Sequence, residues 1–415
     1  SKSELKSAGY SDLEINSIAS GKPGTNETIE YIGPKADVGK INDINDNTFS
    51  LKFTVSGSEP PTYCVKYMVD GEEMQSKTLT VSGEGKYEFE VPKTYGKHDV
   101  NIKVYKGRKK VYDQTHVITY LKNYEKQFMQ DFWRKGFATH MGFGYMYDLD
   151  IDYMEKAGIY YRRDEVPWNC MQYSRSEYTY LPQWWYANDE FLERGHQNAA
   201  IAQAGNVFFL ANGDVDGDAP HERWQLDGFA KYAHTMYTKK HAKFLEVWNE
   251  PNGRGFWKPE PNIEDYINLL KHTYSYVREQ DPEIEIGSFV TAGTDTNFIV
   301  QGMELGAYPY STAIVFHPYI YPDLPANNGL LKNTLNKVDK IVMNYGGWRD
   351  TAVTEIGWPT NYGGNSQEEQ ARAIIQNFVI GDDVGLRYNF AYDLKNDGTS
   401  VLDGEHQFGI YEHNM

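Results

Sequence analysis

The chain has 415 residues, of which 40% are hydrophobic and 24% charged, a composition that is ordinary for a globular protein. Its net charge of −17 argues against nucleic acid and anionic membrane surfaces as partners. No apolar run approaches the roughly 18 residues of a membrane span, and the length favours one large domain plus a smaller one.

The chain begins with Ser and shows no signal peptide, so we expect a processed chain whose export has to be inferred from its function. Its two cysteines, Cys64 and Cys170, are far apart in sequence, which indicates neither a disulfide framework nor a zinc site. Aromatic residues make up 15% of the chain. Such rings cover the apolar faces of sugars but also fill cores, so this enrichment alone decides nothing.

The first 121 residues predict an arm followed by a small β domain. Residues 1–47 are polar, with one weak strand-like patch at 28–32, and we expect an arm with little core of its own. Residues 48–121 alternate apolar and polar side chains between Gly-containing turns, which predicts an immunoglobulin-like β-sandwich. Its strands are predicted at 50–56, 63–69, 77–81, 86–91, 99–105 and 111–120. A supporting role for this domain is favoured over independent glycan binding.

From residue 122 to 415, strand-like and helix-like segments alternate, which predicts a parallel sheet with crossover helices. Eight strand segments in a region of this size predict a (β/α)₈ barrel. These strands are predicted at 139–144, 159–164, 206–212, 244–250, 284–290, 313–319, 351–356 and 386–393. Because Met415 follows soon after Asp393, we expect the eighth helix to be short, absent or replaced.

Capping signals mark several of the intervening helices. Asn262 is placed to cap one helix that Asp281-Pro282 ends, and Gly346-Gly347 closes another. Ser366 and Glu369 form a capping box for a third helix, with Gly381 as the expected stop.

Two stretches share an unusual form, in which an apolar strand-like run ends in a glutamate followed by proline. The first run, from Phe244, leads to Glu250-Pro251, and the second, from Ala352, leads to Glu355 and then Pro359. Pro251 has no N–H and restricts the residue before it, so we expect Glu250 in extended geometry at a strand tip. Most glutamates are solvated surface charges, but a charge in such an apolar context is disfavoured unless it is paired or used.

Barrel geometry then places both glutamates in one site, because active sites of such barrels lie at the C-terminal ends of the strands. Two carboxyl groups that flank one bond are what glycosidic cleavage requires. Glu246 lies one barrel layer below Glu250 on the same face, so we expect a buried carboxylate paired with a barrel cation such as Arg163.

The residues around the two glutamates resemble a known family. Trp248-Asn249-Glu250-Pro251-Asn252 and Thr354-Glu355-Ile356-Gly357-Trp358 resemble the signatures of retaining glycoside hydrolases of the large (β/α)₈ clan, closest to family 39 and related bacterial exopolysaccharide-cleaving endoglycosidases. Further matches are Arg163-Asp164-Glu165, His317-Pro318-Tyr319, Tyr392-Asp393-Leu394 and Asn396-Asp397-Gly398. The resemblance covers about 136–410 and not the sandwich. Arg162 departs from it, since an apolar residue is expected there.

The resemblance implies roles for these residues. Glu250 would be the general acid/base, and Glu355 the nucleophile, kept ionised by donors such as Arg163. Asn249 would bind the sugar 2-hydroxyl, its alternative being a turn-forming amide. The other expected substrate contacts, each with a purely structural alternative, are His317, Tyr319, His140, Asn212, Tyr392 and the possible stacking residues Trp168, Trp257 and Trp358.

The sequence therefore predicts a secreted or cell-surface retaining β-glycosidase, monomeric, acting on a polysaccharide or oligosaccharide. We expect no metal or cofactor, because no His/Cys/Asp group has ligand spacing and an acid–nucleophile pair suffices. The alternative is a non-catalytic glycan-binding or scaffolding protein, which the glutamate pair disfavours. A phosphate-handling barrel lacks support, since no phosphate-binding loop follows the last two strands.

Overall fold

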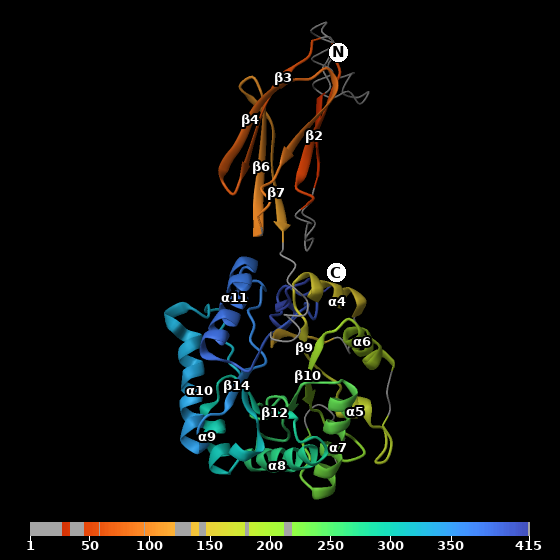
Figure 1. Ribbon diagram of the computed structural model, residues 1–415, viewed down its shortest axis with the longest axis vertical. Coiled ribbons are helices and arrows are strands. Elements are labelled where there is room, and N and C mark those ends of the chain that lie inside the picture. The colour runs from red at the N-terminus through yellow and green to blue at the C-terminus, as the bar shows by residue number, and fades with distance from the viewer. Residues whose placement is uncertain are drawn as a thin grey trace. The chain divides into compact units, whose positions relative to one another are not determined.

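The computed structural model describes residues 27–33, 45–57, 59–94, 96–120, 134–140, 147–178, 182–210 and 218–413 (Figure 1). The chain divides into two compact units, Ser1–Asn123 and Tyr124–Met415. None of the helices in the described part of the chain is long and apolar enough to cross a bilayer.

The first unit contains two antiparallel sheets (Figure 1). One has the strand order β1-β2-β5 and the other β4-β3-β6-β7. The strands are β1 (Glu27–Ile32), β2 (Thr48–Val55), β3 (Thr62–Val69), β4 (Glu72–Thr80), β5 (Gly83–Glu90), β6 (Gly96–Lys106) and β7 (Lys109–Tyr120). The patch assigned to the arm is thus a strand of the sheet, because β1 pairs with β2 and Tyr31 is buried.

One apolar core holds these strands together. Phe49, Leu51 and Phe53 alternate along β2 and are buried with Val65 of β3 and Val104 of β6, as period-two patterning requires. Of the polar residues between them, Lys52 is partly exposed, whereas Ser50 is buried.

The second unit is a closed parallel barrel, as the sequence predicts. Its strands follow the chain order around the ring, from β8 to β15, and β15 pairs with β8 to close it. They are β8 (Lys135–Ala138), β9 (Tyr161–Glu165), β10 (Gln197–Ala202), β11 (Phe244–Val247), β12 (Glu285–Ala292), β13 (Ala313–His317), β14 (Asp350–Val353) and β15 (Tyr388–Ala391).

Two barrel strands are not the predicted ones. The first, β8, ends at Ala138, before the predicted segment 139–144 begins, and the third is also elsewhere. The apolar segment 206–212 begins with a turn after Asn206, and Gln197–Ala202 forms β10 instead. Alanine-rich segments have low strand propensity, but residues 198–202 are all buried between β9 and β11, where small side chains fit. Tertiary packing therefore overrides local propensity here.

Helices surround the barrel (Figure 1). They are α4 (Tyr147–Lys156), α5 (Trp168–Met171), α6 (Pro182–Glu193), α7 (Arg223–Lys239), α8 (Ile263–Gln280), α9 (Thr296–Glu304), α10 (Leu330–Gly346) and α11 (Gln367–Val384). The Asn262 cap, the Ser366 capping box and the Gly347 stop are confirmed. The stop at Gly381 is wrong: α11 continues to Gly385, which adopts the left-handed conformation (φ 80°).

After β15, the described chain forms loops and one short 3₁₀ helix, Glu405–Gln407, and no α-helix up to residue 413. Two other short 3₁₀ helices, Tyr308–Tyr310 and Asn327–Gly329, flank β13. The loops after β15 return to the barrel mouth, where Gly409 donates its backbone N–H to Asn396 (2.8 Å).

Candidate active site

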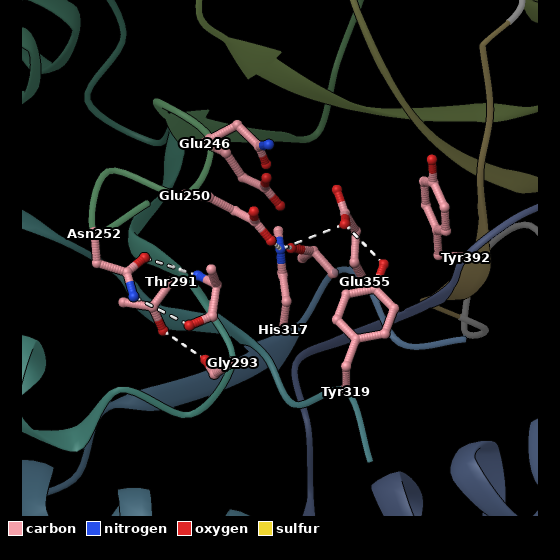
Figure 2. Close-up of polar contacts among 12 residues, drawn as sticks. Glu246, Glu250, Asn252, Thr291, Gly293, His317, Tyr319, Glu355 and Tyr392 are labelled. Carbon is pink, nitrogen blue, oxygen red and sulfur yellow. Dashed lines mark hydrogen bonds and ion pairs between the residues drawn. The ribbon is translucent and has the colours of Figure 1, made fainter. Parts of the chain in front are cut away.

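Glu250 and Glu355 meet at the C-terminal ends of the strands. Glu250 lies three residues after β11 and Glu355 two residues after β14, with His317 at the end of β13 between them. One oxygen of each carboxylate and one ring nitrogen of His317 all lie within 4.8 Å of one another. Figure 2 shows the three side chains converging. The expectation that both glutamates share one site is thus met by the geometry.

A cavity of about 620 Å³ opens over this group. Its walls come from segments that follow most of the barrel strands, as the fold class requires. The lining includes Thr139, His140, Arg163, Glu165, Gln203, Asn249, Glu250, Phe256, Tyr319, Tyr321, Glu355, Tyr392, Asp397, Glu405 and Phe408.

Glu355 is surrounded by hydrogen-bond donors. Tyr319 donates its hydroxyl to Oε2 (2.9 Å), Arg163 donates Nη1 to Oε1, and Nδ1 of His317 lies 3.5 Å from Oε2. Burial opposes ionisation, but the nearby His317 and Arg163 and these hydrogen bonds outweigh it and lower the pKa of Glu355. The carboxylate is therefore held as an anion.

Arg163 links this anion to a deeper layer of the barrel. Its Nε and Nη2 donate to Oε2 of Glu246 at 2.9 and 2.8 Å, and Nη2 also donates to Oδ1 of Asn249 (2.9 Å). The predicted pairing of Glu246 with Arg163 is confirmed, and both side chains are buried. One arginine thus orients a structural carboxylate, the Glu355 carboxylate and the Asn249 amide.

Glu250 has a different environment. Among the described residues, its carboxyl hydrogen-bonds only to His317, whose Nδ1 lies 2.8 Å from Oε1. The other ring nitrogen of His317 lies 3.1 Å from the Thr354 hydroxyl, which can donate or accept. Both imidazole tautomers therefore have hydrogen-bond partners. Nδ1 of His317 can donate to a Glu250 carboxylate or accept from a Glu250 carboxylic acid.

The backbone that presents Glu250 is not the extended geometry expected before a proline. Strand β11 ends at Val247, and both Trp248 (φ 68°) and Glu250 (φ 48°) are left-handed. Glu250 donates its N–H to the carbonyl of Val290 (2.9 Å), which itself has φ 43° next to a bulge in β12. Non-glycine residues adopt this region only where their surroundings enforce it, as at many functional sites.

Asn252 fastens this strained turn to β12. Its Oδ1 accepts from the Ala292 N–H (2.8 Å), and its Nδ2 donates to the Ala292 carbonyl (3.0 Å) and to Asp295 (3.2 Å). Figure 2 shows the amide facing the 291–293 segment. The amide thus pairs with the N–H and the carbonyl of Ala292 as a neighbouring strand would. These bonds fix the turn that carries Glu250.

The cavity wall formed after β8 and β15 is rich in acids. Nδ1 of His140 lies 2.8 Å from Oδ1 of Asp397, and Tyr392 donates its hydroxyl to Glu405 (2.7 Å). Burial disfavours the imidazolium, but the Asp397 carboxylate outweighs this and raises the pKa of His140 to about 10. Burial raises the pKa of Glu165 to about 7, against the opposing effect of His140.

The structure corrects the prediction that three tryptophans stack on sugar rings. Trp168, Trp257 and Trp358 are fully buried and do not line the cavity, so their assignment as sugar contacts is wrong. They pack in the core under the loops: Trp168 against Phe229, for example, and Trp358 with its Nε1 donating to the Asp323 carbonyl (2.8 Å). A tryptophan after a strand tip can face either way, and sequence does not say which.

Other expected contacts do reach the cavity. His140, Arg163, Asn249, Tyr319 and Tyr392 line it, whereas Asn212 lies outside the described residues. His317 is fully buried and does not line the cavity, so it contacts Glu250 and Glu355 rather than a sugar. Sequence reasoning missed the exposed rings of Phe256 and Tyr321, together with Gln203 and Glu405, and it gave no role to Glu165 of the Arg163-Asp164-Glu165 match. Gln203 was missed because it directly follows β10, a strand that the sequence did not predict.

Arg162, the departure from the family pattern, is buried on the outer side of β9. Its Nε donates to Asn198 (2.6 Å) and its Nη2 to Asn188 of α6 (3.1 Å), and the guanidinium lies 4.2 Å from the centre of the Phe191 ring. Neighbouring strand residues point to opposite faces, so Arg162 and Arg163 serve separate networks.

Comparison with known proteins bears on the fold. A solved family 39 glycoside hydrolase from Bacteroides cellulosilyticus aligns with a TM-score of 0.62 at 18% identity, covering 86% of this chain and 75% of that one. The chain has the fold of the family 39 glycoside hydrolases. A second structure, a GH39 enzyme from Xanthomonas axonopodis pv. citri, aligns with a TM-score of 0.51 at 14% identity, covering 69% of this chain and 64% of that one. The resemblance stated from the residues is thus confirmed.

Sequence similarity is more local. A beta-xylosidase of Geobacillus stearothermophilus is 28% identical over 113 residues, which are 26% of this chain and 22% of that protein. A beta-xylosidase of Caldicellulosiruptor saccharolyticus is 27% identical over 106 residues, 25% of this chain and 22% of that protein. The chain therefore spans about a fifth of the length of these curated relatives. No family model matches the sequence.

Proposed function

We propose that the protein is a retaining β-glycoside hydrolase with Glu355 as the nucleophile and Glu250 as the acid/base. The observation that carries this proposal is the approach of the two carboxylates, with oxygens within 4.8 Å across one cavity. Retaining enzymes hold their carboxyl groups about 5–5.5 Å apart, whereas inverting enzymes need about 6.5–9.5 Å to admit a water.

The environments of the two glutamates support the division of roles. Glu355, with Arg163 and Tyr319 as donors, is an anion that can attack the anomeric carbon. Glu250, whose partner His317 accepts or donates, can carry a proton to the leaving oxygen. The first step forms the Glu355–sugar bond, breaks the glycosidic bond and moves the Glu250 proton to the leaving group.

In the second step Glu250 takes a proton from water, whose oxygen attacks the anomeric carbon and releases Glu355. Two inversions restore the β configuration. Asn249, with its Oδ1 held by Arg163, has its Nδ2 left to donate to the sugar 2-hydroxyl. The exposed rings of Phe256 and Tyr321 supply apolar faces for sugar stacking.

We further propose that the substrate is a polysaccharide or oligosaccharide met outside the cell, and that the protein acts as a monomer. The first unit, with strand orders β1-β2-β5 and β4-β3-β6-β7, fits an immunoglobulin-like sandwich that supports the enzyme. The curated beta-xylosidase relatives make xylosides the first substrates to try.

The test is a panel of aryl β-glycosides, beginning with the β-xyloside, with the first-formed sugar followed by proton NMR. We expect at least one β-glycoside to be cleaved with the β anomer appearing first. An α anomer formed first would contradict retention. If wild type and Glu355→Ala are equally inactive on the whole panel and on polysaccharides, the non-catalytic alternative replaces this proposal.

A further inference from the structure

A second group of metal-ligand side chains lies where the barrel closes, and two of its three members, His140 and Asp397, line the cavity. His140 follows β8, and Asp393 and Asp397 follow β15, its neighbour in the ring. One nitrogen or oxygen atom from each of the three lies within 4.8 Å of the other two. Donors that share one ion at about 2.0–2.4 Å are at most about 4.8 Å apart, so the three atoms fit around a single cation.

Asp393 points to a missing partner. Its side chain is 2% exposed, and its Oδ1 accepts no hydrogen bond within the described part of the chain. A buried carboxyl oxygen without a hydrogen-bond donor is costly, by about 1–3 kcal/mol in general. The buried hydroxyl of Thr139 likewise has no partner among the described residues. It lines a cavity of about 10 Å³ with His140 and Asp397, which is about the volume that one water or ion needs.

Nearby cations are largely committed elsewhere. Lys395 pairs with Asp150 (3.2 Å), and Arg163 binds Glu246 and Glu355. His140 faces Asp397, while Glu165 and Glu405 add two further carboxyl groups to the same cavity. A cation bound among these carboxyl groups would offset their negative charge.

We propose that His140, Asp393 and Asp397 bind one divalent cation in the wall of the cavity. An imidazole with two carboxylates suits a first-row ion such as Mn²⁺ or Zn²⁺ better than Mg²⁺ or Ca²⁺, which prefer oxygen ligands alone. The expectation of no metal relied on spacing along the chain, whereas barrel closure brings residues 140 and 393 together. If the protein is a glycosidase as proposed, such an ion lies where sugar hydroxyls can reach it.

The test uses the full chain, stripped with a chelator and titrated with MnCl₂ or ZnCl₂ by calorimetry, with thermal unfolding in parallel. Wild type should bind one ion per chain and unfold at a higher temperature when loaded. Asp393→Asn should weaken binding at least tenfold. Asp397→Asn, which should do the same, serves if the first variant does not fold.

Asp339→Asn is the matched control. This half-buried carboxylate of α10 accepts from Thr351 (3.1 Å) and does not line the cavity, so the variant should bind like wild type. The inference is overturned if wild type binds neither ion, if Asp393→Asn and Asp397→Asn both bind like wild type, or if Asp339→Asn weakens binding equally. Because binding and unfolding are measured without substrate, a failure here is distinguishable from a failure of the proposed activity.

Discussion

The barrel carries an arginine–glutamate cluster at each end, and the two differ in how completely their carboxylates are satisfied. At the strand starts, Glu285 of β12 accepts from Arg387, which directly precedes β15 (2.5 and 3.0 Å), from Arg134 (3.2 and 3.3 Å) and from the Tyr388 hydroxyl (3.0 Å). Both oxygens are used, and all partners come from the barrel itself. This cluster serves only to tie strands together.

At the strand ends, Arg163 also binds two glutamates, but their carboxylates are less completely hydrogen-bonded. Oε1 of Glu246 is buried without a partner among the described residues, and Glu355 faces a cavity. Incomplete satisfaction is costly for stability, and it is tolerated where it serves function. The same residue types therefore tie strands together at the base of the barrel and, at its mouth, form the site of the proposed chemistry.

The largest effect we expect is at the mouth. Glu355→Ala removes the proposed nucleophile and should lower kcat by at least about 10⁴-fold on every substrate, because no covalent intermediate could then form. Its free energy of unfolding should stay within about 1 kcal/mol of wild type, because Arg163 keeps Glu246. Steady-state kinetics and urea unfolding check both parts. Retained activity would contradict the role, and a severe loss of stability would break the comparison.

Two adjacent aromatic residues, Phe256 and Trp257, distinguish a ring that lines the cavity from one that packs in the core. Trp257→Ala should lower the free energy of unfolding by about 3–5 kcal/mol, because the ring is fully buried. Phe256→Ala, at a ring that is 39% exposed in the cavity, should cost less than about 1 kcal/mol and instead raise KM. Urea unfolding and steady-state kinetics on both variants test this. If Trp257 were the sugar contact, Trp257→Ala would raise KM and Phe256→Ala would cost more stability.

At the base, Glu285→Gln should cost about 2 kcal/mol of stability and leave kcat unchanged. Burial opposes ionisation of Glu285, but Arg387 and Arg134 outweigh it and lower its pKa. The contribution is therefore present above the unfolded-state pKa of about 4.3 and is lost as pH falls through the folded-state value. The gap in Tm between wild type and variant should be constant from pH 6 to 8, on the order of a few degrees, and close in acid.

Glu283→Gln, at an exposed neighbouring position, is the matched control and should change Tm little at any pH. A Glu285→Gln gap that widens in acid would contradict the sign of this linkage.

The smallest effect concerns Tyr319. Tyr319→Phe removes one donor to Glu355, so the pKa of Glu355 should rise and the acidic limb of the kcat/KM profile should move to higher pH. At the optimum we expect a loss of about tenfold, or about 1.4 kcal/mol. Tyr310→Phe, outside the cavity, is the control. An unshifted acidic limb would show that the hydroxyl does not hold the anion.

Much of this account could be predicted from the sequence, because local signals agreed with the fold. Eight alternating segments predicted the barrel, and the apolar runs ending at Glu250 and Glu355 predicted which acids share a site. Strand alternation predicted that Glu246 is buried and paired with a barrel cation, and Arg163, one candidate, is that partner. Each of these rests on periodicity or on strand polarity, which sequence carries directly.

The rest depends on packing that a linear pattern does not contain. The alanine-rich β10 is a strand only because its neighbours enclose it, and Glu250 is left-handed only because Val290 and its surroundings hold it there. The His140–Asp397 contact joins residues that meet only when β15 pairs with β8.

The most direct test of the central claim is azide rescue of the acid/base variant. Glu250→Ala should lower kcat by about 10²- to 10⁴-fold on substrates with poor leaving groups. The loss should be much smaller on an activated aryl β-glycoside, because its leaving group departs without protonation. Because water then lacks its base, added azide should restore turnover by attacking the Glu355–sugar intermediate. The account predicts a β-glycosyl azide from Glu250→Ala. An α-glycosyl azide from Glu355→Ala, with Glu250→Ala unaffected by azide, would contradict it.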